Sequence, residues 1–216
     1  MNVVLMGMPG VGKGTQAAML KDALNVPHVS SGDILREAVR AGSSLGRKVR
    51  GLLDSGQLVP DDMMGDLIVN RLGQNDARGG FVLDGFPRTQ PQVGILDRAL
   101  NRLGGQLDAV FLLTAPEDEI VRRLSGRRVC PQCASVFHLE GNPPQSPGVC
   151  DGCGSALVQR QDDSEEVVRG RFEVYREQTL PIAQSYQERE LLREIDGIGE
   201  PQAVFGRLGQ AVEQAS

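Results

Sequence analysis

The sequence predicts an α/β fold in which helices cover both faces of a mostly parallel β-sheet. Three short apolar runs suit buried strands, at residues 2–6, 80–84 and 109–113, and segments with helical spacing lie between them. This alternation of strand and helix is typical of a three-layer domain. Residues 126–163 depart from the pattern and are expected to form an insert.

The first strand leads into a glycine-rich loop and then a helix. Residues 15–24 place Ala17, Ala18, Leu20 and Leu24 on one side, as an amphipathic helix requires. A short strand is expected over residues 26–29. The run Ser-Ser-Gly-Asp that follows it suits the N-terminus of a second helix, because serine and aspartate accept hydrogen bonds from free backbone N–H groups.

The middle of the chain contains further helices around the second core strand. Helical spacing predicts helices over residues 45–53 and 61–72, which the turn-rich residues 55–60 separate. The strand at 80–84 is followed by a predicted helix over 89–103.

The last part of the chain repeats the strand and helix alternation. The strand at 109–113 precedes a helix over 116–124, which has proline in its first turn. Residues 163–166 resemble a helix start with a capping-box acid, and residues 194–196 and 201–212 predict a last short strand and a closing helix.

The insert at residues 126–163 has few apolar side chains and is rich in Cys, Pro and Gly. It contains two Cys-x-x-Cys pairs, Cys130 with Cys133 and Cys150 with Cys153, which 16 residues separate. This spacing predicts a closed, tetrahedral structural Zn²⁺ site, and a metal would replace the core that so short a segment lacks. Two disulfides, free thiols, or iron in place of zinc are the alternatives.

Composition restricts the function classes. The net charge of −5 and the 4% aromatic content argue against a protein that coats nucleic acid or an anionic membrane. No apolar run approaches the roughly 20 residues that a membrane span requires, and the N-terminal strand lacks the features of a signal peptide. We therefore expect a cytoplasmic protein, in which cysteines are more often metal ligands than disulfides.

The loop Gly7-Met-Pro-Gly-Val-Gly-Lys13-Gly-Thr15 lies between a strand and a helix, which is the context of a phosphate-binding loop. Its glycines allow backbone N–H groups to approach phosphate oxygens, and Lys13 adds a positive charge. The general motif has a hydroxyl residue directly after the lysine, whereas here Gly14 intervenes before Thr15. A tight glycine-rich turn without a ligand is the alternative interpretation.

Five motifs, in order along nearly the whole chain, resemble the adenylate kinase family, in which the displaced hydroxyl is normal. They are Gly7–Gln16; Asp84-Gly-Phe-Pro-Arg-Thr89 with Gln92; Ser31-Gly-Asp33 with Arg36; Gly126-Arg-Arg128; and Arg160-x-Asp-Asp163 with Arg171. Because the resemblance covers essentially the whole chain, it favours the long-lid, zinc-containing bacterial type. Ser31 departs from the threonine more usual in the family but keeps the hydroxyl.

The resemblance implies a phosphate-loop nucleoside monophosphate kinase fold with three parts. The core would comprise residues 1–29, 60–125 and 164–216, with a helical AMP-binding insert at 30–59 and the zinc-binding lid at 126–163. It implies ATP contacts from Gly10, Val11, Gly12, Lys13, Gly14, Thr15, Arg127, Val136, Phe137 and Gly199. It implies AMP contacts from Ser31, Arg36, Gln57, Leu58, Val59, Gly85, Phe86, Pro87, Arg88, Gln92, Arg160 and Arg171.

The implied reaction is the transfer of a phosphoryl group from Mg²⁺-bound ATP to AMP, which gives two ADP. The attacking phosphate oxygen is already ionised, so the reaction requires positioning and charge neutralisation rather than a general base. Asp33 and Asp84 are candidates to hold the water shell of Mg²⁺. The residues expected to act in catalysis are Lys13, Arg88, Arg123, Arg127, Arg160 and Arg171. The family also implies a monomer.

Three other functions are weighed against this one. A UMP or CMP kinase is the nearest, although pyrimidine-directed members generally have a short lid. A switch GTPase would need an Asn-Lys-x-Asp motif, and the chain contains no Asn-Lys pair. A zinc-ribbon NTPase that binds nucleic acid is disfavoured by the net acidity.

Overall fold

In the computed structural model, which describes residues 1–215, five parallel strands form the central sheet. They follow the order β2-β3-β1-β4-β7, and in one register Val3 of β1 lies opposite Val82 of β3 and Ala109 of β4. The predicted parallel α/β fold is confirmed. The strands are β1 (Asn2–Gly7), β2 (His28–Ser30), β3 (Phe81–Asp84), β4 (Ala109–Thr114) and β7 (Leu192–Asp196).

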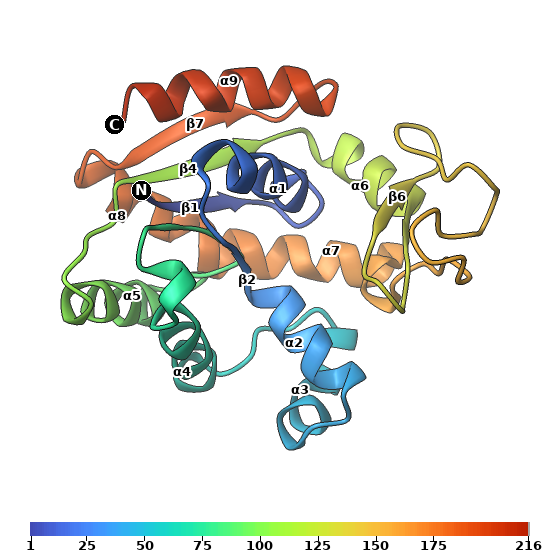
Figure 1. Ribbon diagram of the computed structural model, residues 1–216, viewed down its shortest axis with the longest axis horizontal. Coiled ribbons are helices and arrows are strands. Elements are labelled where there is room, and N and C mark those ends of the chain that lie inside the picture. The colour runs from blue at the N-terminus through green and yellow to red at the C-terminus, as the bar shows by residue number, and fades with distance from the viewer. Residues whose placement is uncertain (216) are drawn as a thin grey trace.

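The sheet divides two hydrophobic clusters, because successive side chains of a strand point to opposite faces. In β1, Val4 and Met6 belong to one cluster, whereas Val3 and Leu5 belong to the other. The first cluster is covered by α4 (Asp61–Leu72), α5 (Gln90–Arg102) and α8 (Leu180–Glu188). The second is covered by α1 (Lys13–Leu24), α6 (Glu117–Gly126), α7 (Glu165–Val174) and α9 (Pro201–Glu213), and Figure 1 shows α9 along the side opposite α4 and α5.

Two inserts extend from this three-layer core. Helices α2 (Ser31–Arg40) and α3 (Ser44–Asp54) project from the end of β2 (Figure 1), and the side chains of Ser30 and Ser43 cap them. The second insert follows α6 and contains the antiparallel strands β5 (Arg127–Val129) and β6 (Val136–His138).

The two inserts touch. The Arg40 guanidinium of α2 donates to the carbonyl oxygens of Pro131 and Gln132, at 3.3 and 3.4 Å. A small apolar cluster in the second insert contains Cys130, Phe137 and Cys150. Among residues 1–215, no helix has the length and apolar character needed to cross a bilayer.

Most predicted elements are confirmed, and their ends differ by a few residues. The predicted α4 matches its observed bounds, whereas α1 begins earlier, at Lys13, and the second strand lies later, at His28–Ser30. The capping-box expectation was wrong, because Ser164 precedes α7 without a side-chain hydrogen bond to it. The elements that were not predicted from the sequence are α8, the short strands β5 and β6, the 3₁₀ turns Asn75–Ala77 and Gln161–Asp163, and the π-helical turn Tyr175–Thr179.

Candidate active site

The glycine-rich loop after β1 is shaped by residues with positive φ. Gly7, Gly10 and Gly12 have φ values of 140°, 89° and 110°, which side chains other than glycine rarely adopt. A Cβ atom at Gly10 would lie 2.5 Å from the Leu124 side chain, so the loop packs directly against α6. Helix α1 begins at Lys13 with no side-chain cap, which leaves its first N–H groups available to an anion.

Lys13 lies at the centre of this loop. Its ammonium group donates to the carbonyl oxygens of Gly7 and Met8, at 2.8 and 2.9 Å. Burial, together with the nearby positive charges of Arg88 and Arg171, lowers the pKa of Lys13 to about 8, although Asp84 opposes this shift. The site therefore has an excess of positive charge that a polyphosphate would neutralise.

Two clefts meet beside Arg88 and Arg171. The first includes Lys13 among its lining residues, and the second includes Gln92. Both clefts are lined in part by Arg88 and Arg171. Of the residues expected to bind AMP, the second cleft contains Ser31, Arg36, Gln57, Leu58, Val59, Gly85, Arg88, Gln92 and Arg171.

The arginines around the clefts repel one another. Burial and the charge of Arg171 lower the pKa of Arg88 to about 10, and burial with the charges of Arg36 and Arg127 lowers the pKa of Arg160 to about 10. The Nε of Arg88 donates to the Gly85 carbonyl oxygen at 2.7 Å, which fixes the side chain. Such crowding of cations favours the binding of anionic ligands.

Three of the arginines expected to act in catalysis pair with acidic side chains or lie beside them. Arg123 donates to Glu119 at 2.7 Å and to the Val11 carbonyl oxygen at 3.1 Å, which connects α6 to the glycine-rich loop. Arg171 donates to the Asp162 carboxylate at 2.9 Å. The Arg127 guanidinium pairs with both carboxylate oxygens of Asp163.

The two candidate acids for the Mg²⁺ water shell have different surroundings. Burial alone would raise the pKa of Asp84, but contact with His28 and the charges of Lys13 and Arg88 outweigh it and keep the carboxylate ionised. The Asp33 side chain is 58% exposed and pairs with Arg36 at 2.7 Å. A buried, ionised carboxylate beside the phosphate loop suits Mg²⁺ hydration, so Asp84 fits this role better than Asp33.

Of the residues expected at ATP, only Lys13 lines either of these two clefts. Val136 is 50% exposed, whereas the Phe137 side chain is buried in the small core of the insert. Phe86, which is expected at AMP, is buried in the main core. Gly199, with φ of 105°, lies in the loop between β7 and α9. The Gln16 side chain of α1 donates a 3.0 Å hydrogen bond to the carbonyl oxygen of Pro201, the first residue of α9.

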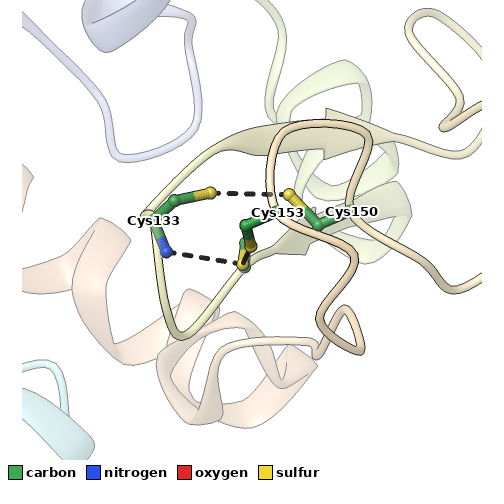
Figure 2. Close-up of side chains that lie close together, drawn as sticks. Cys133, Cys150 and Cys153 are labelled. Carbon is green, nitrogen blue, oxygen red and sulfur yellow. Dashed lines mark hydrogen bonds between the residues drawn. The ribbon is translucent and has the colours of Figure 1, made fainter.

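The four cysteines of the second insert form one cluster. Their sulfur atoms all lie within 4.8 Å of one another, and Cys130–Cys153 and Cys133–Cys150 are separated by 3.4 Å. Figure 2 shows the Cys133 and Cys150 sulfur atoms pointing toward each other, with Cys153 beside them. These distances exceed the roughly 2.05 Å of a disulfide. They approach the roughly 3.8 Å between sulfurs that share a tetrahedral zinc ion, so the cluster fits a metal.

Sequence reasoning missed two residues that hold site residues in place. The Thr179 hydroxyl, in the π-helical turn, donates to the Arg88 carbonyl oxygen at 3.0 Å. Asp61, at the start of α4, accepts from the side chains of Thr89 and Gln92 at 2.9 and 2.8 Å. No local pattern marks Thr179, and the position of Asp61 at a helix start accounts for an acidic residue without any contact to the site.

The phosphate-binding loop, the two adjoining clefts and the ring of arginines define a nucleotide phosphotransferase of the phosphate-loop class. Residues 5–191 match the family model described as adenylate kinase, and the chain belongs to the adenylate kinase family. It is 47% identical over 214 residues to the adenylate kinase of Methanocella arvoryzae, an alignment that covers 99% of each chain. It is 48% identical over 212 residues to that of Moorella thermoacetica (98% of each chain), and 49% identical over 214 residues to that of Streptomyces griseus (99% of this chain and 98% of the relative).

The protein is therefore an enzyme that transfers a phosphoryl group between ATP and AMP, with ADP as the product, and it uses Mg²⁺ with ATP. The full-length similarity does not favour the pyrimidine-directed kinase, the GTPase or the nucleic-acid-binding NTPase weighed above.

Proposed function

We propose that ATP binds in the first cleft and AMP in the second, so that their phosphates meet beside Arg88 and Arg171. One observation carries this placement: the two clefts have these arginines in common, and Lys13 lies in only one of them. A shared cationic wall brings two polyanions together, which would otherwise repel each other.

In this arrangement an α-phosphate oxygen of AMP attacks the γ-phosphorus of ATP. A new P–O bond forms as the bond to the β–γ bridging oxygen breaks, and the two products are ADP. The attacking oxygen carries no proton at neutral pH, so the chain supplies charge rather than a base. Lys13 and Arg88 neutralise the transferred group, while Arg123, Arg127, Arg160 and Arg171 complete the cationic ring.

The proposed contacts are those that the family resemblance implies, and Lys13 is the member of the ATP set that lines the first cleft. ATP would contact Gly10, Val11, Gly12, Lys13, Gly14, Thr15, Arg127, Val136, Phe137 and Gly199, and Phe137 would contribute its backbone because its side chain is buried. AMP would contact Ser31, Arg36, Gln57, Leu58, Val59, Gly85, Phe86, Pro87, Arg88, Gln92, Arg160 and Arg171. Mg²⁺ supplies positive charge between the ATP phosphates when it is bound, and Asp84 with Asp33 would hold its waters.

We further propose that residues 126–163 form a lid and residues 30–59 a separate AMP-binding part, both carried by the core. The contact of Arg40 with Pro131 and Gln132 supports closure of the lid onto the AMP part, which would exclude water from the reaction. Zinc held by Cys130, Cys133, Cys150 and Cys153 would stabilise the lid without contact to substrate.

We also propose that the enzyme acts as a cytoplasmic monomer without nucleic acid or membrane partners. The net charge of −5 supports the absence of nucleic-acid and membrane partners, because it would repel polyanions.

The placement is tested by Arg88→Lys, with the exposed Arg98→Lys on α5 as the matched control. A lysine cannot reproduce the planar fork of arginine, and we expect kcat for ADP formation from ATP and AMP to fall about 100-fold or more. The control should retain kcat within about twofold. Full activity of Arg88→Lys, or of Lys13→Ala, would refute the placement, and Mg²⁺ omission should abolish turnover in every variant.

A further inference from the structure

Gln92 is a buried polar side chain with two directional partners in the structure. It lies on α5, lines the second cleft and is 2% exposed. Its amide nitrogen donates to Oδ1 of Asp61 at 2.8 Å, and its amide oxygen accepts from the backbone N–H of Arg88 at 2.8 Å. The Thr89 hydroxyl donates to the same Asp61 oxygen at 2.9 Å.

These partners permit only one orientation of the amide. A carboxylate can only accept hydrogen bonds, and a backbone N–H can only donate them. If the amide turned over, its oxygen would face the Asp61 carboxylate and its NH₂ group would face the Arg88 N–H. Both contacts would become repulsive in a place nearly closed to water, where unpaired polar groups are costly.

We propose that Asp61 is a specificity-determining positioning residue, which fixes the Gln92 amide so that the cleft accepts a 6-aminopurine and rejects a 6-oxopurine. The proposal rests on the placement of AMP in the second cleft. Asp61 is the first residue of α4 and is not among the residues that line this cleft, so it acts through Gln92.

The chemistry of the two bases explains the selectivity. Once the amide is fixed, its remaining N–H and its remaining lone pair occupy fixed places. Adenine offers an acceptor, N1, beside a donor, the 6-amino group; a 6-oxopurine offers a donor, N1–H, beside an acceptor, O6. The phosphate is held at Arg88, so the base cannot turn over to exchange these atoms. A 6-oxopurine would require the amide to flip, which the Asp61 carboxylate and the Arg88 N–H both oppose.

The test compares AMP with inosine monophosphate, in which only the 6-amino group is replaced by an oxo group, as acceptors for ATP. The wild-type enzyme should favour AMP in kcat/KM by about 100-fold or more, because a buried hydrogen-bonding site rejects a mismatched partner strongly. In Asp61→Asn the new amide can accept or donate, so a flipped Gln92 keeps a partner at residue 61 and only the Arg88 N–H still opposes the flip. We expect the preference to fall about tenfold.

The expected change in Asp61→Asn lies mainly in KM, because the arginines that act on the phosphates are untouched. Asp62→Asn, at the exposed neighbouring residue of α4, is the matched control and should keep the wild-type preference within about twofold. If Asp61→Asn fails to fold by circular dichroism, Asp61→Ala tests the same point, because it also removes the acceptor-only partner.

A wild-type enzyme that uses AMP and inosine monophosphate within threefold of each other would overturn the proposal without any variant. An unchanged preference in Asp61→Asn would overturn it as well. Gln92→Leu separates the two levels of inference. If this variant leaves KM for AMP unchanged, the placement of AMP is wrong; if KM rises while Asp61→Asn keeps the preference, only the role of Asp61 is wrong.

Discussion

The Arg127 guanidinium binds both oxygens of the Asp163 carboxylate, whose side chain has no exposed surface. This ion pair connects the start of the second insert, at β5, with its end, just before α7. Asp163 also lies 3.9 Å from Arg171. The buried carboxylate of Asp163 therefore reduces the repulsion between these two arginines where the second insert joins the core.

Asp163→Asn should destabilise the protein and lower its activity. The substitution keeps the size of the side chain but removes the charge, which leaves Arg127 without an acidic partner, whereas Arg171 keeps Asp162. Because Arg127 is itself 19% exposed, we expect a loss of about 2–3 kcal/mol in the free energy of unfolding, at the low end for a broken buried pair. Thermal denaturation measures this, with the exposed Asp22→Asn on α1 as the control. Equal melting temperatures for the two variants would contradict the prediction.

The stability of the ligand-free enzyme should depend on the proton of Lys13. Burial and neighbouring arginines lower its pKa from 10.5 to about 8 in the folded chain. Between these values the unfolded chain binds more protons than the folded chain at this residue, so this group adds stability as pH rises. The melting temperature of the wild type, relative to that of Lys13→Met at the same pH, should therefore rise as the pH increases from about 7 to about 10.

Saturating Mg²⁺-ATP should reduce the rise of the wild-type melting temperature with pH, because phosphate charges favour the protonated lysine. Parallel pH profiles for the ligand-free wild type and Lys13→Met would show that Lys13 is not the group responsible.

The parts of the fold predicted from the sequence are those with local signals. The strand at Phe81–Asp84 is a continuous apolar run, and α4 has helical spacing between a turn and a glycine, so both were found. Helix α8 was missed because it follows α7 through a π-helical turn, which shifts its apolar residues Ile182 and Tyr186 out of the α7 pattern.

The candidate site shows the same division. Lys13 and the cysteines lie in motifs whose spacing carries their chemistry, and the structure brings the sulfurs together. Thr179 and Asp61 act through partners that are distant in sequence, 91 residues away for Thr179 and 31 for the contact of Asp61 with Gln92. Tertiary folding alone creates these contacts, so periodicity and spacing contain no trace of them.

Removal of the metal from the cysteine cluster should lower thermal stability more than catalysis. The proposed lid has only a small apolar cluster, so a metal held by the four cysteines would stabilise its fold, whereas four sulfur ligands would leave no position for substrate. We expect a chelator under reducing conditions to lower the melting temperature by several degrees, with kcat at low temperature within about threefold. Metal analysis by mass spectrometry verifies the removal. An unchanged melting temperature after complete removal would contradict a structural metal.

The two cysteine turns of the second insert share one backbone hydrogen bond but differ in the residue at the position with positive φ. The backbone N–H of Ala134 donates to the Cys130 carbonyl oxygen at 3.0 Å in the first turn. In the second turn, the backbone N–H of Gly154 donates to the Cys150 carbonyl oxygen at 2.8 Å. Both residues are left-handed, with φ of 61° for Ala134 and 73° for Gly154. A side chain costs about 1–2 kcal/mol in this conformation, so the alanine turn contains strain that the glycine turn avoids.

Exchanging these residues should therefore have opposite effects. Ala134→Gly relieves the strain but makes the unfolded chain more flexible, and we expect a net gain of about 0.5 kcal/mol in stability. Gly154→Ala introduces the strain and should lose about 1 kcal/mol, although nothing lies within 4 Å of its added Cβ atom. Thermal denaturation and competition for zinc against a chromogenic chelator both measure the difference. Shifts of the same sign in the two variants would show that left-handed strain does not control these turns.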